Sequence, residues 1–171
     1  MKRLAILRHA KSSWGDPTLD DFNRPLNKRG WKAAQRMGAE FARRGLRFDH
    51  VLASTAARVR ETIEGLGQEL DLGASIDFDP DIYLANEATL LSRVRALPES
   101  TKAPLIVGHN PGLERLLLGL TRNDSAGFRA IVAEGYPTAA FAVVELPAGR
   151  WDEVEPGNGK IVELTLPREL D

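Results

Sequence analysis

The chain has 171 residues, of which 43% are hydrophobic, and 23 Lys and Arg residues nearly balance 24 Asp and Glu residues. This length and composition predict one domain, residues 1–171, with a buried core, and the net charge of −1 gives no general attraction to nucleic acid or to an anionic membrane. The absence of cysteine excludes disulfides, thiolate metal ligands and a cysteine nucleophile. The first apolar stretch has only four residues, too few for a secretory signal or a membrane span, so we expect a cytoplasmic protein.

The first predicted element is a strand that ends in two side chains able to carry out chemistry. Residues 4–7 (Leu-Ala-Ile-Leu) are a short apolar run, typical of a strand that is buried on both faces. Arg8 and His9 follow directly. Ligands of open parallel sheets bind beside the carboxyl ends of the strands, so we expect both side chains at a functional edge. Residues 12–24, rich in Asp, Ser and Pro, are predicted as a long loop.

Helices and strands alternate through the middle of the chain. Apolar residues recur at helical spacing where helices are expected, and short apolar runs mark the strands. Asn27 is the expected cap of the first helix, and Ser54–Thr55 that of the second. The predicted order is a helix ending near Arg43–Gly45, a strand over 48–53, a helix over 54–70, a short strand over 75–78 and a helix opened by Asn86 or Glu87 and ended by Pro98.

The second half of the chain repeats the pattern of a buried strand followed by a histidine. Residues 104–108 carry no charge and are mostly apolar, and His109 follows them before a leucine-rich helix. Two closing strands are expected over 139–146 and 160–166, and they could pair antiparallel at one edge. The alternation of strands and helices predicts an α/β sandwich around a mainly parallel sheet.

Three junctions between a strand and a helix carry arginine or histidine, and parallel strands would bring them to one edge of the sheet. Arg8 and His9 follow the first strand, and Arg58 lies one turn into the helix after the second. Two guanidiniums can grip a tetrahedral anion, and nearby helix N-termini add backbone donors. The arginines also disfavour protonation of His9, whose neutral imidazole is a competent nucleophile toward phosphorus. A protonated His109 would stabilise charge in the transition state, so the sequence predicts a phosphoryl-transfer site without metal or cofactor.

A zinc site is the competing interpretation of the two histidines. It lacks a third ligand at suitable spacing, because His50 lies before a predicted strand rather than after one. No HExxH, Walker-type or GxGxxG pattern is present. The acidic pairs Asp20–Asp21 and Glu153/Glu155 are predicted on solvated turns. No metal ligands are therefore assigned.

Short motifs along the chain resemble those of one protein family. The segments are Leu7–Trp14, Arg24–Gly30, Ser54–Arg58 with Thr62, Gly108–Glu114 and Pro167–Leu170. In this order they resemble the histidine phosphatase superfamily, the phosphoglycerate-mutase-like group, and within it the SixA-type phosphohistidine phosphatases. Many members have Gly where this chain has Ala10 and Pro where it has Thr55, and neither change removes a catalytic group.

The resemblance implies a doubly wound, three-layer α/β/α fold without a large cap insertion. It implies that His9 is the nucleophile and is transiently phosphorylated. Arg8, Arg58 and His109 would complete the phosphate pocket. Glu87 is a candidate general acid by its position in the chain.

Two features favour a phosphorylated protein as the substrate. A pocket without a cap can admit a side chain of another protein, and a neutral imidazole leaves phosphorus more readily than an alkoxide does. We therefore expect a phosphatase for protein phosphohistidine that needs no cofactor. The alternatives are a small-molecule phosphomonoesterase with the same mechanism and a phosphate-binding module without turnover. No nucleic-acid or membrane partner is expected.

Overall fold

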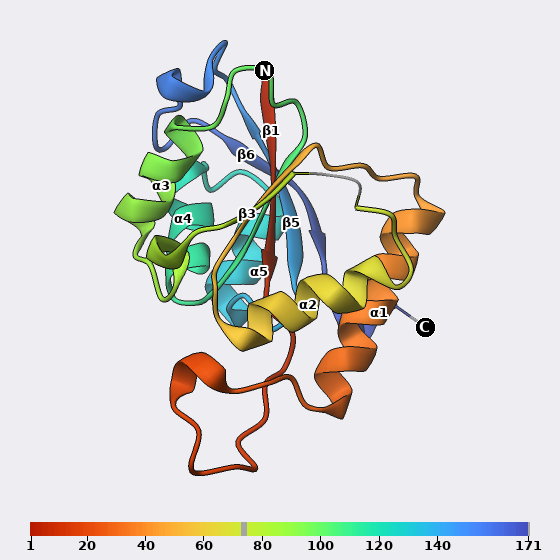
Figure 1. Ribbon diagram of the computed structural model, residues 1–171. Coiled ribbons are helices and arrows are strands. Elements are labelled where there is room, and N and C mark those ends of the chain that lie inside the picture. The colour runs from red at the N-terminus through yellow and green to blue at the C-terminus, as the bar shows by residue number, and fades with distance from the viewer. Residues whose placement is uncertain (73–74, 171) are drawn as a thin grey trace.

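The computed structural model describes residues 1–72 and 75–170, and a six-stranded sheet lies at its centre (Figure 1). The strands are β1 (Lys2–Arg8), β2 (His50–Ala53), β3 (Ser75–Phe78), β4 (Pro104–Gly108), β5 (Phe141–Leu146) and β6 (Lys160–Thr165). Their order across the sheet is β3-β2-β4-β1-β5-β6. The first three pairs in this order are parallel, whereas β5 is antiparallel to both of its neighbours. The mainly parallel sheet and the antiparallel closing strands are thus confirmed.

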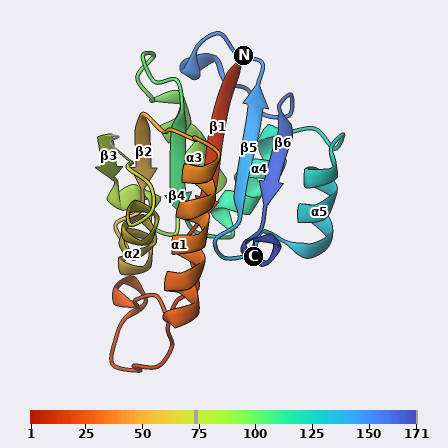
Figure 2. The same ribbon diagram turned by 90° about the vertical axis from the view of Figure 1, so that its right-hand side faces the viewer.

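Helices cover both faces of the sheet (Figure 2). They are α1 (Lys28–Arg43), α2 (Ala57–Gly67), α3 (Glu87–Arg95), α4 (Gly112–Leu120) and α5 (Ala126–Glu134). α1 and α2 contribute Phe41 and Leu66 to one hydrophobic core, while α3 and α4 contribute Leu90 and Leu117 to the other. The expected three-layer α/β/α arrangement results. None of the helices in the described ranges is both long and apolar enough to cross a bilayer.

One of the two expected helix caps, Asn27, is confirmed, and of the two residues expected to open α3, Asn86 is the one that caps it. The side chains of Asn27 and Asn86 accept hydrogen bonds from main-chain N–H groups in the first turns of α1 and α3. The cap expected at Ser54–Thr55 is wrong, since Ala56 holds the cap position of α2 and offers no side-chain acceptor. The hydroxyl of Ser54 contacts the ring of His109 at 2.7 Å instead. Ser54, a residue type that is typical of helix caps, therefore bonds to His109 instead of capping the helix.

Helix α5 is not predicted by the sequence pattern. Ser125 caps it by accepting a hydrogen bond from the N–H of Phe128 at 3.0 Å. Within the helix, however, Ile131 is the single buried residue and Val132 is exposed. A short helix that buries one side chain has no apolar stripe from which it could be recognised.

The sheet topology brings three strand ends together. β4 lies between β2 and β1, with Gly108 opposite Arg8 and Val107 opposite Ala53. The segments that follow these strands therefore start at the same edge, where ligands of open α/β sheets bind. The loop of residues 12–24 leaves β1 at this edge and extends beyond the sheet (Figures 1 and 2).

Candidate active site

The four residues assigned to the site from the sequence lie around one pocket at this edge. His9, Arg58 and His109 are only 6%, 2% and 3% exposed, and Arg8 is half-buried. The ring centroids of the two histidines are 5.3 Å apart. All four side chains line the pocket, and Asp21 lies among them. The structure thus brings together residues from three separate segments of the chain.

Hydrogen bonds fix the tautomer of His9. Its Nδ1 lies 2.7 Å from the carbonyl oxygen of Ala10, which can only accept, so Nδ1 carries the proton. The lone pair is then on Nε2, toward which Nε of Arg58 donates at 3.4 Å. The N–H of Ala10 donates to Thr62 Oγ1 at 3.0 Å, and the Thr62 hydroxyl donates to the Arg58 carbonyl at 2.6 Å. These bonds tie the loop after β1 to α2 and leave Nε2 as the nucleophilic atom.

His9 is neutral at near-neutral pH. Burial is the largest cause and lowers its pKa from 6.5 to about 4, with a further contribution from the charges of the neighbouring arginines. The hydrogen bond to the Ala10 carbonyl opposes this shift without reversing it. The arginines expected to keep His9 neutral do contribute, but burial matters more. A neutral imidazole with an unprotonated Nε2 is the state needed for attack on phosphorus.

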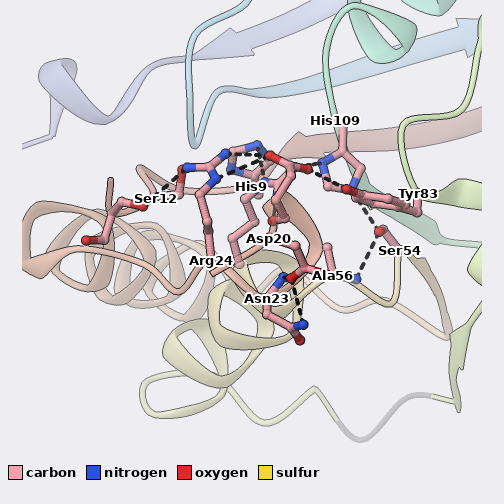
Figure 3. Close-up of polar contacts among 12 residues, drawn as sticks. His9, Ser12, Asp20, Asn23, Arg24, Ser54, Ala56, Tyr83 and His109 are labelled. Carbon is pink, nitrogen blue, oxygen red and sulfur yellow. Dashed lines mark hydrogen bonds and ion pairs between the residues drawn. The ribbon is translucent and has the colours of Figure 1, made fainter. Parts of the chain in front are cut away.

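His109 is held in the opposite tautomer. Arg58 can only donate, so its Nη2 donates to Nδ1 of His109 at 3.3 Å and the proton lies on Nε2. That Nε2 donates to Ser54 Oγ at 2.7 Å, a contact drawn in Figure 3. Burial first, then repulsion from His9 when it is protonated and from the charge of Arg58, lowers the pKa of His109 to about 3. His109 is therefore neutral in this structure rather than the imidazolium that charge stabilisation would require.

Asp21 is the site residue that the sequence does not reveal. Its carboxylate accepts hydrogen bonds from Arg58 Nη2 at 3.0 Å, from Arg24 Nη2 at 2.9 Å and from the hydroxyl of Tyr83. Its carbonyl accepts another from Arg58 Nη1 at 2.7 Å. The side chain of Asp21 is 41% exposed, which is compatible with the solvated turn predicted for Asp20–Asp21, but that prediction missed these contacts with the pocket. Burial acts to raise the pKa of Asp21, but the hydrogen bonds from Tyr83 and the two arginines outweigh it and hold that pKa far below its usual value.

The guanidinium of Arg8 is held by a main-chain carbonyl. Its Nη1 donates to the carbonyl oxygen of Tyr136 at 3.0 Å. Its Nε is buried and has no hydrogen-bond partner within the described ranges, an arrangement that costs free energy. The other N–H groups of this guanidinium are available to an anion in the pocket.

Two exposed apolar side chains line the mouth of the pocket. Trp14, on the loop of residues 12–24, is 77% exposed, and the guanidinium of Arg24 stacks on its ring at 3.5 Å. Leu84 is 54% exposed and has a left-handed backbone with φ of 51°. Residues other than glycine are strained in this conformation, and such strain often marks functional sites. Lys11 lines the same pocket and adds a positive charge to the mouth.

Two other residues considered from the sequence lie away from the pocket. Glu87, the candidate general acid, begins α3 and lines a separate, mostly apolar hollow with Leu91 and Leu116. His50 begins β2, at the opposite end of the strand from the pocket. In the part of the chain that the structure describes, no three His, Asp or Glu side chains are grouped so as to hold a metal ion.

Comparisons with known sequences agree with this geometry. The pattern of the histidine phosphatase superfamily (branch 1) matches residues 4–83, the part of the chain that contains Arg8, His9 and Arg58. An uncharacterized protein of Mycobacterium leprae is 32% identical over 168 residues, which cover 95% of this chain and 100% of that protein. An uncharacterized chloroplastic protein of Arabidopsis thaliana is 27% identical, over 97% of this chain and 78% of its own length.

Two solved structures with the same fold are described as phosphatases. A putative phosphohistidine phosphatase SixA from Agrobacterium tumefaciens matches with a TM-score of 0.81 and 30% identity, over 97% of this chain and 98% of its own. A protein histidine phosphatase SixA complexed with tungstate matches with a TM-score of 0.81 over 99% of both chains. Its identity of 22% supports a shared fold alone.

Proposed function

Because the chain belongs to the histidine phosphatase superfamily, in its SixA-type branch, and is therefore a phosphatase, we propose that it transfers the phosphoryl group of its substrate to Nε2 of His9. The observation that carries this proposal is the state of the His9 ring, with Nδ1 bonded to the Ala10 carbonyl and Nε2 unprotonated. The guanidinium of Arg58 lies beside that same Nε2, at 3.4 Å. A nucleophilic atom and an anion-binding group therefore meet at one point.

Two displacements complete the reaction. In the first, the lone pair of Nε2 attacks phosphorus, the Nε2–P bond forms, and the bond from phosphorus to the leaving group breaks. When the substrate is a phosphohistidine whose other ring nitrogen carries a proton, the leaving group is a neutral imidazole. The proton of His9 stays on Nδ1 and keeps its hydrogen bond to the Ala10 carbonyl. In the second, water attacks phosphorus and supplies the oxygen and protons of inorganic phosphate, while the electrons of the Nε2–P bond return to His9.

The remaining pocket residues bind and stabilise the phosphoryl group. Arg8 and Arg58 offer planar N–H donors to its nonbridging oxygens. A bound dianion opposes the effects that keep His109 neutral, because a negative charge nearby raises the pKa of an imidazole. In that complex His109 is able to take up a proton and donate to the oxygens on which charge develops.

A phosphorylated protein is the substrate class that we favour. The exposed Trp14 and Leu84 at the pocket mouth are apolar surface that a folded partner can cover. A neutral imidazole leaving group needs little acid assistance, and Glu87 lies outside the pocket. Both points favour protein phosphohistidine over alkyl phosphate esters.

Trapping the covalent intermediate tests the nucleophile. Brief mixing with a phosphohistidine-carrying protein, followed by an alkaline quench, should leave acid-labile phosphate on His9, mapped by mass spectrometry. His9→Ala should abolish both the label and phosphate release. His50→Ala, a matched change at a histidine outside the pocket, should affect neither. Phosphate release by His9→Ala at the wild-type rate would rule out the proposed intermediate.

Comparing substrates separates this proposal from its two alternatives. A higher kcat/KM for the phosphohistidine protein than for an aryl or sugar phosphate supports the protein substrate. The reverse order identifies a small-molecule phosphomonoesterase with the same mechanism. Binding of phosphate with no turnover of either substrate identifies a phosphate-binding module.

A further inference from the structure

The orientation of Arg8 depends on the main chain of Tyr136. Within the described ranges, the Nη1 bond to the Tyr136 carbonyl oxygen is the hydrogen bond that the Arg8 side chain makes, and Nε has no partner. A shift of this carbonyl would therefore move the guanidinium relative to His9, its neighbour in the chain. Whatever fixes the main chain at Tyr136 also fixes Arg8.

Two side chains near the start of α4 hold both main-chain polar groups of Tyr136. Asn110 Nδ2 donates to the Tyr136 carbonyl at 2.8 Å, and Glu114 Oε1 accepts from the Tyr136 N–H at 2.8 Å. The main-chain N–H of Glu114 donates to Asn110 Oδ1 at 3.3 Å, so the Asn110 side chain is also tied to the first turn of α4. The Tyr136 hydroxyl donates to the Ile6 carbonyl in β1 at 2.6 Å. The segment is thus fixed from α4 on one side and from β1 on the other.

A carboxylate suits the position of Glu114. It lies in the first turn of α4, where the helix dipole favours negative charge. Gly135 has φ of 81°, and a Cβ on it would lie 3.4 Å from Glu114 Oε1, so the carboxylate sits directly against this turn. Burial lowers the pKa of Arg8, and the charge of Glu114 acts in the opposite direction. Glu114 therefore supports Arg8 both through the main chain and through its charge.

We propose that Glu114, together with Asn110, is a positioning residue for phosphoryl binding, because it fixes the main chain of Tyr136 whose carbonyl orients Arg8. The inference rests on the proposed function, in which Arg8 holds oxygens of the phosphoryl group. Glu114 does not line the pocket, so it acts through Arg8 rather than on the substrate. Its loss should appear as weaker binding of a phosphate anion.

Equilibrium binding of inorganic phosphate, measured by calorimetry, tests the proposal without requiring turnover. Glu114→Ala should weaken phosphate binding about tenfold, the effect of losing one part-buried hydrogen bond that sets the geometry of a charged group. Glu114→Gln keeps an amide oxygen that can accept the Tyr136 N–H, and its affinity should stay within about threefold of wild type. This difference between the two variants is what a hydrogen-bonding role requires.

Glu99→Ala is the matched control. The carboxylate of Glu99 also accepts a main-chain N–H from a buried aromatic residue, Trp151, at 2.8 Å, but it lies outside the pocket. Both alanine variants should lower the unfolding midpoint in urea by similar amounts. Only Glu114→Ala should weaken phosphate binding.

An Arg8→Ala background separates positioning from general damage to the fold. If Glu114 acts through Arg8, Glu114→Ala causes no further loss of phosphate affinity in that background. The same tenfold loss in both backgrounds, or unchanged binding in the single variant, overturns the inference. Turnover by His9→Ala would instead contradict the proposed function and leaves the phosphate-binding comparison as it stands.

Discussion

The two arginines of the pocket are anchored by different kinds of structure. Arg8 bonds to a main-chain carbonyl of Tyr136, a residue that is buried in the core beneath α4. Arg58 bonds to the carboxylate and carbonyl of Asp21, on the loop that extends beyond the sheet in Figure 1. One anchor is therefore set by core packing, and the other by a charged side chain on a loop.

This difference predicts how strongly substitutions at each anchor affect the activity of the protein. The side chain of Arg58 is 3% exposed, whereas that of its partner Asp21 is 41% exposed. Removing the charge of Asp21 leaves a buried cation without its anion, which is more costly than disturbing a neutral hydrogen bond. Removing the charge on the loop side should therefore reduce activity more than a change on the core side does.

Asp21→Asn should have the largest effect. Its amide keeps one acceptor oxygen and replaces the other with a donor, so it cannot accept from both Arg24 and Arg58, and it carries no negative charge. We therefore expect kcat/KM to fall about a hundredfold, or about 2.7 kcal/mol. Steady-state phosphate release measures this loss. Asp20→Asn is the matched control, because Asp20 bonds to Asn23, as Figure 3 shows, and contacts neither arginine in the described part of the chain. Equal losses of kcat/KM in the two variants would show that the contacts of Asp21 with the arginines have no special importance for activity.

Counted per residue, the pH dependence of stability should be the next largest effect. The folded pKa values of about 4 for His9 and about 3 for His109 lie below the ordinary 6.5. Below pH 6.5 the unfolded chain binds protons at both positions that the folded chain does not, so the free energy of unfolding falls as pH falls toward 4. Between pH 7 and 5 each histidine should contribute a loss of about 2 kcal/mol.

Urea unfolding at pH 7 and pH 5 measures this loss. His9→Gln removes one of the two titrating groups and should reduce the loss by about half. An identical pH dependence in the wild type and in His9→Gln would mean that His9 is not held neutral by the fold.

Features with a local signal could be predicted from the sequence. Residues 4–7 and 104–108 form buried strands, and a strand buried on both faces must be apolar along its length. His9 and His109 follow these runs directly, so their meeting at one edge follows from parallel pairing alone. The cap at Asn27 is local in the same sense, since its partner lies within the next turn.

The features that could not be predicted depend on partners far away in the chain. Asp21 resembles any acid in a polar loop, because Arg58 and Tyr83 lie 37 and 62 positions away. Ser54 resembles a helix cap, because its partner His109 lies 55 positions away. Residue type and spacing carry no information about such contacts before the topology is known.

Tyr136→Phe should separate stability from binding on the core side. It removes the hydroxyl that donates to the Ile6 carbonyl, so the free energy of unfolding should fall by about 1–2 kcal/mol. The carbonyl that holds Arg8 is main chain and keeps its bonds from Asn110, so phosphate affinity should change by less than about twofold. Urea unfolding and phosphate calorimetry measure the two quantities. A large loss of affinity would mean that phosphate binding is as sensitive to changes at the core anchor as to changes at the loop anchor.

The smallest effect is expected at the rim, where Leu84→Asn tests the class of substrate. Asn tolerates the left-handed backbone of this position and removes apolar surface that a partner protein would cover. We expect kcat/KM to fall about fivefold for a phosphohistidine protein, roughly 1 kcal/mol of lost burial, and to stay unchanged for free phosphohistidine. Val132→Gln, at an exposed apolar residue outside the pocket, should change neither value. An equal fall for both substrates would show that Leu84 shapes the pocket itself rather than a surface that a partner protein covers. No fall for either substrate would show that Leu84 does not help to select a protein substrate.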